Sequence, residues 1–185
     1  MDLQEAQAFF LQYNGLEFHM FHDDPRRYRA FQALSIPQAT LEEWRQQLIA
    51  EHFAHLEAPA GRGTFSLALL RLLEVLAQST APVQTHCRRL IRLLSAAEGL
   101  EEAQKLRVLE LMAGREGDGH DGGVWLVCTR SGLAPELGRA LEQLGGFPCS
   151  WAEMDRYQRA LQKIRRILAG FVSPAPDHRQ RPGGP

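Results

Sequence analysis

The chain has only three cysteines, Cys87, Cys128 and Cys149, and no two of them form a C-x-x-C pair. Cysteine zinc sites and redox-active dithiols use such short spacings, so the sequence predicts neither. It also lacks the run of about twenty apolar residues that a membrane-spanning helix requires. No basic segment followed by an apolar run opens the chain, as it would in a signal peptide. These absences favour a cytoplasmic protein with reduced thiols and no membrane contact.

The motifs of several enzyme classes are absent as well. The sequence contains no H-E-x-x-H, G-x-S-x-G, S-x-x-K or P-loop motif, which serve zinc hydrolysis, acyl transfer and phosphate binding. No glutamate is followed by a histidine three residues later, the pattern of di-iron helical bundles. The sequence therefore favours a protein that is not an enzyme, and we expect no cofactor.

The charge is nearly balanced overall and uneven along the chain. The formal net charge is -1, with 6 basic and 10 acidic side chains in residues 1–80 and 15 and 12 in residues 81–185. All basic residues except Lys105 and Lys163 are arginines, which bind carboxylates and phosphates through planar paired contacts. A balanced charge without a strongly basic region does not favour nucleic-acid binding. It favours a protein partner or a second copy of the chain.

Leucine-rich helical patterns dominate the middle of the chain. Residues 64–79 are apolar around most of a helical wheel, so other helices must surround this segment. Leu69, Leu73 and Leu76 are expected to be among its least exposed side chains. Asp24–Pro25 predicts one helix start, and the capping-box patterns Thr40–Glu43 and Ser150–Glu153 predict two more.

These patterns predict a mainly α fold, either a compact multi-helix bundle or a small HEAT-like helical stack, with at most one short strand pair. We expect a single α-helical domain over residues 1–171 and a disordered Pro/Gly-rich tail over residues 172–185. The last helix is expected to end near Ala169. Residues 124–129 could form a strand paired with residues 16–21, or a short buried helix.

A cluster of histidines and carboxylates suggests an alternative function. His19, His22 and Asp23 lie within five residues, and imidazole and carboxylate groups together suit zinc, manganese or iron. His52 and His55 fall on the apolar sector of the helix that is expected to follow Thr40. If these side chains converge, they would form a divalent-metal site in a metal-dependent hydrolase.

A second metal hypothesis rests on the order of four residues. His86, His120, Asp121 and Asp155 follow one another as H…HD…D, which resembles the ligand order of the all-helical HD-type metal phosphohydrolases. The resemblance implies a metal-dependent phosphohydrolase. In that family the HD pair lies on a helix, whereas glycines flank the pair in this chain.

Two arginine-rich helical faces are candidate partner-binding sites. We expect both faces to project into solvent, and such faces can hold carboxylates through bidentate contacts. The leading hypothesis is therefore a protein–protein interaction or self-association module. The candidate residues are Arg88, Arg89 and Arg92 on the first face, and Arg156, Arg159, Lys163 and Arg166 on the second.

Overall fold

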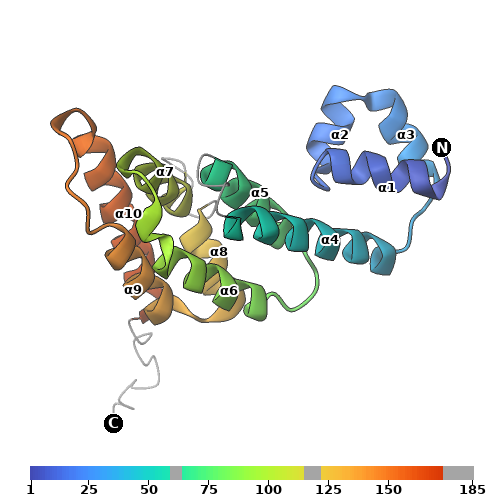
Figure 1. The fold of residues 1–185 in the computed structure, drawn as a ribbon. Coiled ribbons are helices and arrows are strands. Elements are labelled where there is room, and N and C mark those ends of the chain that lie inside the picture. The colour runs from blue at the N-terminus through green and yellow to red at the C-terminus, as the bar shows by residue number, and fades with distance from the viewer. Residues whose placement is uncertain (59–63, 115–121, 173–185) are drawn as a thin grey trace, which may run out of the picture.

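The computed structural model describes residues 1–58, 64–114 and 122–172, which form ten α-helices and no strand. The mainly α prediction is confirmed, and the helices pack side by side as a bundle (Figure 1). In chain order they are α1 (Leu3–Gln12), α2 (Glu17–Asp23), α3 (Pro25–Ala33), α4 (Gln38–Glu57), α5 (Phe65–Gln78), α6 (Gln84–Ser95), α7 (Glu102–Ala113), α8 (Gly123–Ser131), α9 (Ala134–Leu144) and α10 (Met154–Val172). The 3-10 helices η2 (Ala97–Gly99) and η3 (Trp151–Glu153) precede α7 and α10.

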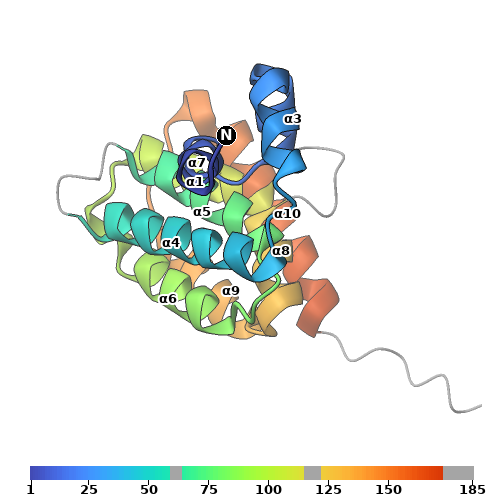
Figure 2. The same cartoon turned by 90° about the vertical axis from the view of Figure 1, so that its right-hand side faces the viewer.

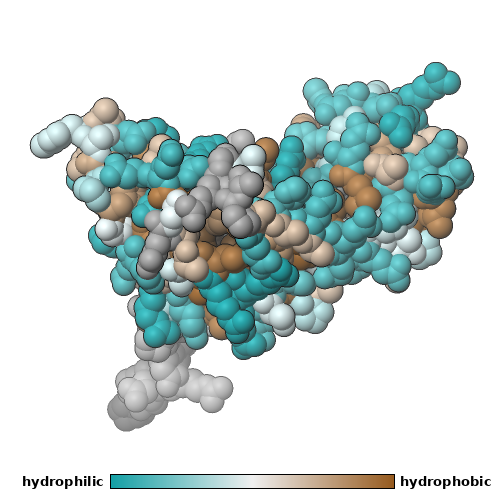
Figure 3. Space-filling view, in the orientation of Figure 1, coloured by the Kyte–Doolittle hydropathy of each residue, from teal (hydrophilic) through white to brown (hydrophobic). Residues whose placement is uncertain are grey.

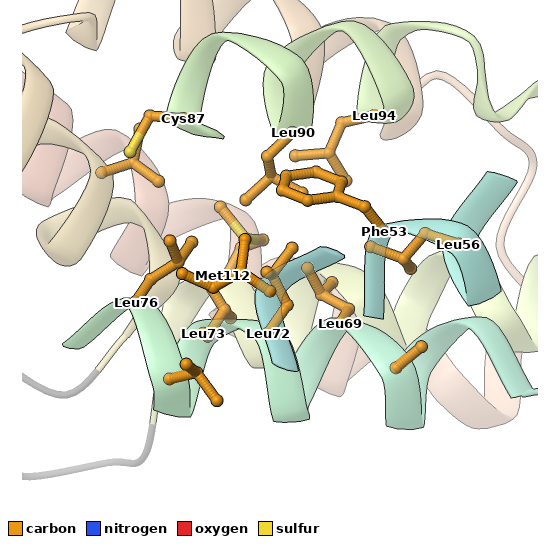
Figure 4. Packing of buried hydrophobic residues seen from close by; sticks show 14 of the residues in the cluster. Phe53, Leu56, Leu69, Leu72, Leu73, Leu76, Cys87, Leu90, Leu94 and Met112 are labelled. Carbon is orange, nitrogen blue, oxygen red and sulfur yellow. The ribbon is translucent and has the colours of Figure 1, made fainter. Parts of the chain in front are cut away.

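Helix α5 lies at the centre of the apolar core. Leu69, Leu72 and Leu76 are fully buried, and Leu73 is 8% exposed. Figure 4 shows these side chains facing Phe53 of α4, residues of α6 and Met112 of α7. The prediction that α5 is surrounded by other helices is therefore confirmed.

Two of the three most closely packed helix pairs are formed by helices that are not consecutive in the chain. Helix α4 packs along α5, but α6 packs along α9 and α7 along α10. A stack of HEAT-like repeats would pair each helix with the next one. The observed pairing is that of a bundle. Figure 2 shows α4 lying between α5 and α6, with α1 above them.

Some helix starts agree with the local sequence signals and others do not. Asp24 accepts a hydrogen bond from the Arg27 backbone N–H at 3.0 Å and caps α3, as predicted. The Thr40 capping box is wrong, because α4 already begins at Gln38, directly after Pro37. Ser150 is the N-cap residue of η3, which continues directly into α10, so this helix start is as predicted, but the Ser150 side chain makes no capping hydrogen bond.

The two ambiguous segments are both helical. Residues 17–23 form α2 and residues 123–131 form α8, in which Val124 and Val127 are fully buried. A helix satisfies its own backbone hydrogen bonds, whereas a lone buried strand would leave them unpaired. Helix α10 runs to Val172, beyond the expected end near Ala169. The rest of the predicted tail, residues 173–185, lies outside the described residues. None of the described helices has the length and apolarity needed to cross a bilayer.

Asn14 joins α1 to the body of the bundle. It is 5% exposed and adopts a positive φ of 57°. Its side-chain amide donates to the Arg71 carbonyl and to Glu74 Oε2, both at 3.0 Å. Its oxygen lies 2.6 Å from Nε2 of His52. One side chain therefore links the end of α1 to both α4 and α5.

Replacing Asn14 with glycine is expected to lower the free energy of unfolding by about 1–2 kcal/mol. Glycine tolerates the positive φ, so the loss reports on the three hydrogen bonds rather than on backbone strain. Urea unfolding of Asn14→Gly beside Gln12→Gly, at the exposed last residue of α1, would measure it. A loss for Asn14→Gly no larger than that of the control would contradict the linking role.

Candidate functional site

Helix α6 has an apolar side and a basic side. Its buried residues are Cys87, Leu90, Ile91 and Leu94, which face the core at helical spacing. Arg88, Arg89 and Arg92 are exposed and form what we call the α6 arginine face. The local sequence therefore determines both sides, because one helix period places the leucines inward and the arginines outward.

Arg89 is fixed by neighbours from α4. Its Nε and one terminal nitrogen donate to the two carboxylate oxygens of Glu57 at 2.7 and 2.6 Å. Its guanidinium lies 4.3 Å from the centre of the Phe53 ring, within the range of a cation–π interaction. The hydrogen bonds from Arg89 lower the pKa of Glu57. Arg89 is thus held by a residue of its own chain.

His86 packs beside this pair. Its ring stacks on Phe53 with a centroid distance of 6.0 Å, and its Nε2 lies 3.0 Å from Oε1 of Gln46. Burial and the charge of Arg89 lower the pKa of His86, which favours the neutral imidazole. Phe53 therefore has His86 and Arg89 against its ring.

Arg88 and Arg92 differ from Arg89 in having no ion-pair partner among the residues that the structure describes. They stand one helical turn apart over a surface hollow of about 610 Å³. The hollow is lined by Glu57, Thr85, Arg88, Arg89, Arg92, Leu93 and Ala96. Figure 3 shows hydrophilic residues over much of the surface on this side of the molecule, with smaller hydrophobic areas between them. Two exposed guanidinium groups with their planar donors can bind carboxylates here.

The second predicted face, on α10, is largely engaged within the molecule. Arg156 donates to both carboxylate oxygens of Glu110 on α7 at 2.9 Å and to Glu153 at 3.2 Å. Arg159 and Lys163 each interact with another group as well, and Lys163 is half-buried. Arg166 is exposed. Arg156 is exposed, as expected, but its pairing with Glu110 also connects α10 to α7.

The histidines of α2 pack against their own helix. His19 and His22 are exposed, and both rings contact the ring of Phe18, at centroid distances of 5.6 and 5.9 Å. The Nδ1 atom of His22 lies 3.0 Å from a carboxylate oxygen of Asp23. Phe18 is itself 71% exposed. Helix α2 thus presents imidazole and phenyl rings on one surface.

The histidines of α4 lie elsewhere. His52 bonds to Asn14, and burial lowers its pKa. His55 is exposed and 3.9 Å from Glu51, so its expected inward orientation is wrong. The core at this end of α4 is formed by Phe53 and Leu56, and His55 lies outside the buried sector of the helix. Within the described part of the chain, no three His, Cys, Asp or Glu side chains gather to hold a metal, and the five predicted ligands are all in that part.

The residues of the HD-type resemblance are only partly visible. His86 is half-buried against Phe53, and Asp155 is exposed at the start of α10. His120 and Asp121 lie outside the described residues. The structure therefore provides no support for a phosphohydrolase centre.

Comparison with known proteins adds no family. No family model, curated protein or solved structure matches this chain. The function is therefore inferred from the chemistry of the α6 arginine face.

Sequence reasoning missed the residues that distinguish the three arginines. Glu57 and Phe53 lie more than thirty positions before Arg89 and reach it only because α4 packs beside α6. A single sequence contains no signal for such a pairing. The helical period alone predicts that Arg88, Arg89 and Arg92 are exposed, and the tertiary contacts decide which of them has a partner within the chain.

Proposed function

We propose that the protein is an interaction module that binds an acidic segment of another protein through the α6 arginine face. One observation carries the proposal. Arg88 and Arg92 are exposed one turn apart over the hollow and have no ion-pair partner among the described residues. Arginine is common in protein interfaces because its planar donors pair with carboxylates and its stem covers apolar surface.

The neighbouring pair supports this chemistry. Glu57 already binds Arg89 through both carboxylate oxygens on the same face. This contact shows that a carboxylate can approach the α6 arginine face in a bidentate geometry. A partner carboxylate at Arg88 or Arg92 would make the same type of contact.

Reversing the charges of Arg88 and Arg92 is expected to weaken binding of an acidic probe. Fluorescently labelled poly-L-glutamate, titrated at low salt, should bind the wild-type protein, and Arg88→Glu with Arg92→Glu should weaken this binding by roughly tenfold or more. Binding should also weaken with added salt, because exposed charges are screened over about 10 Å at 0.1 M. Fluorescence anisotropy measures both effects, and circular dichroism checks that the helices remain.

The matched control reverses two exposed arginines that belong to neither candidate face, Arg139 on α9 and Arg165 on α10. This variant has the same change in net charge, and its binding is expected to stay within about twofold of wild type, since these residues lie outside the hollow. Equal losses of affinity in the two variants would show that only the net charge of the protein matters for binding. Unchanged binding in the α6 variant would also contradict the proposed site.

A further inference from the structure

Four exposed residues form a row along the outer surface of α6. Thr85, Arg88, Arg92 and Ala96 follow one another at spacings of three and four residues, so they form a single ridge. At 1.5 Å per residue the ridge is roughly 16 Å long. Leu93 is half-buried beside it. The ridge is therefore basic in its middle and apolar at its C-terminal end.

Only one side of α6 is open to another helix. Its inner side packs on α9 and α8, and Arg89 with Glu57 occupies the side toward α4. Among the described residues, no helix covers the ridge itself, where Thr85, Arg88, Arg92 and Ala96 are exposed. Ridges at this spacing pack into the grooves between side chains of a neighbouring helix.

The geometry points to the kind of partner, and this inference rests on the proposed function. We propose that the acidic segment is an amphipathic helix that packs along the ridge. Two of its carboxylates, one turn apart, bind Arg88 and Arg92, whose spacing along α6 is the same. An apolar side chain one turn beyond the carboxylate pair covers Leu93 and Ala96.

On its described α-helices, a second copy of the chain does not offer this pattern. None of the ten described α-helices contains two acidic residues three or four positions apart, and the nearest case is the N-cap residue Asp2 with Glu5 of α1. Both are already used at the start of α1, where each accepts the backbone N–H of the other, at 2.8 and 2.9 Å. The partner is therefore a different protein.

Two designed peptides test whether binding depends on the spacing of the two carboxylates along the partner helix. Both are alanine-rich helices of about 16 residues with two glutamates, two leucines and glutamines for solubility. In the matched peptide the glutamates are four residues apart, and a leucine lies four residues beyond each, so that either chain direction fits. In the shifted peptide the glutamates are two residues apart and point to opposite sides. Composition and net charge are identical.

The matched peptide is expected to bind roughly tenfold more tightly than the shifted peptide, as measured by fluorescence anisotropy at low salt. Arg88→Gln and Arg92→Gln should each remove most of this difference, while Arg165→Gln should leave it intact. Equal binding of the two peptides would overturn the helical register. The proposed function would still stand if poly-L-glutamate binds, and it would fail if neither poly-L-glutamate nor the peptides bind. A concentration-dependent dimer that dissociates in the Arg88→Glu, Arg92→Glu variant would overturn the choice of a different protein as partner.

Discussion

Replacing Leu72 with alanine is expected to lower the free energy of unfolding by about 2–5 kcal/mol. Leu72 is fully buried on α5, which packs on α4, α7 and α8. Truncation removes apolar contacts and leaves a cavity that surrounding helices fill only in part. Urea unfolding followed by circular dichroism at 222 nm would measure the change. This prediction is the most direct test that α5 is the centre of the core.

Leu67 provides the matched control, because it lies on the same helix and is 55% exposed. Leu67→Ala makes the same chemical change without opening a cavity, so its effect is expected to stay within about 0.5 kcal/mol. Similar losses for the two variants would show that helix propensity, and not burial, explains the result. A loss below that limit for Leu72→Ala would show that α5 is peripheral.

The sequence predicts the helices better than their ends. The apolar side chains of α5 recur around most of the helical wheel, and this pattern suffices to infer a surrounded helix. The Thr40 capping box failed because a box is one of several ways to satisfy the first backbone donors. At Pro37 the chain turns into α4 earlier, and no side chain caps it. Residues 124–129 are a short apolar run, for which the helical and strand patterns cannot be told apart by periodicity.

The candidate site was also predicted in part. Exposure of Arg88 and Arg92 follows from the helical period of α6. The pairing of Arg89 with Glu57 and of Arg156 with Glu110 depends on which helices are neighbours in space. That arrangement follows from the packing of the whole core, and local patterns do not contain it. The same reason explains the failed convergence of the histidines on α2 and α4.

Glu42 on α4 is another residue whose role only the structure shows. Its carboxylate accepts hydrogen bonds from the Ser79 hydroxyl at 2.5 Å and from the Thr80 backbone N–H at 3.0 Å. Gln46 donates to it at 2.9 Å. Arg130 donates to the Ser79 carbonyl at 2.7 Å. These contacts hold the turn after α5 against α4, just before the chain enters α6.

The electrostatics of Glu42 follow from these bonds. Burial alone raises the pKa of a carboxyl group, but here the hydrogen bonds from Ser79, Thr80 and Gln46 outweigh burial and lower the pKa of Glu42 to about 2. The carboxylate form is therefore favoured in the folded state relative to the unfolded chain. Its contribution to stability is fully present above the unfolded pKa of about 4.5 and is lost as the pH falls toward 2.

Glu42→Gln is expected to lower the free energy of unfolding at pH 7 by about 2–3 kcal/mol, because the amide keeps the shape and loses the charge that these donors stabilise. The difference from wild type should shrink below pH 4.5 and nearly vanish near pH 2. Urea unfolding at several pH values would measure it. Glu43→Gln is the matched control, since Glu43 is the exposed neighbour on the same helix, and its effect should stay within about 0.5 kcal/mol at every pH. A destabilisation by Glu42→Gln that does not change between pH 7 and pH 3 would show that the residue acts through packing and not through its charge.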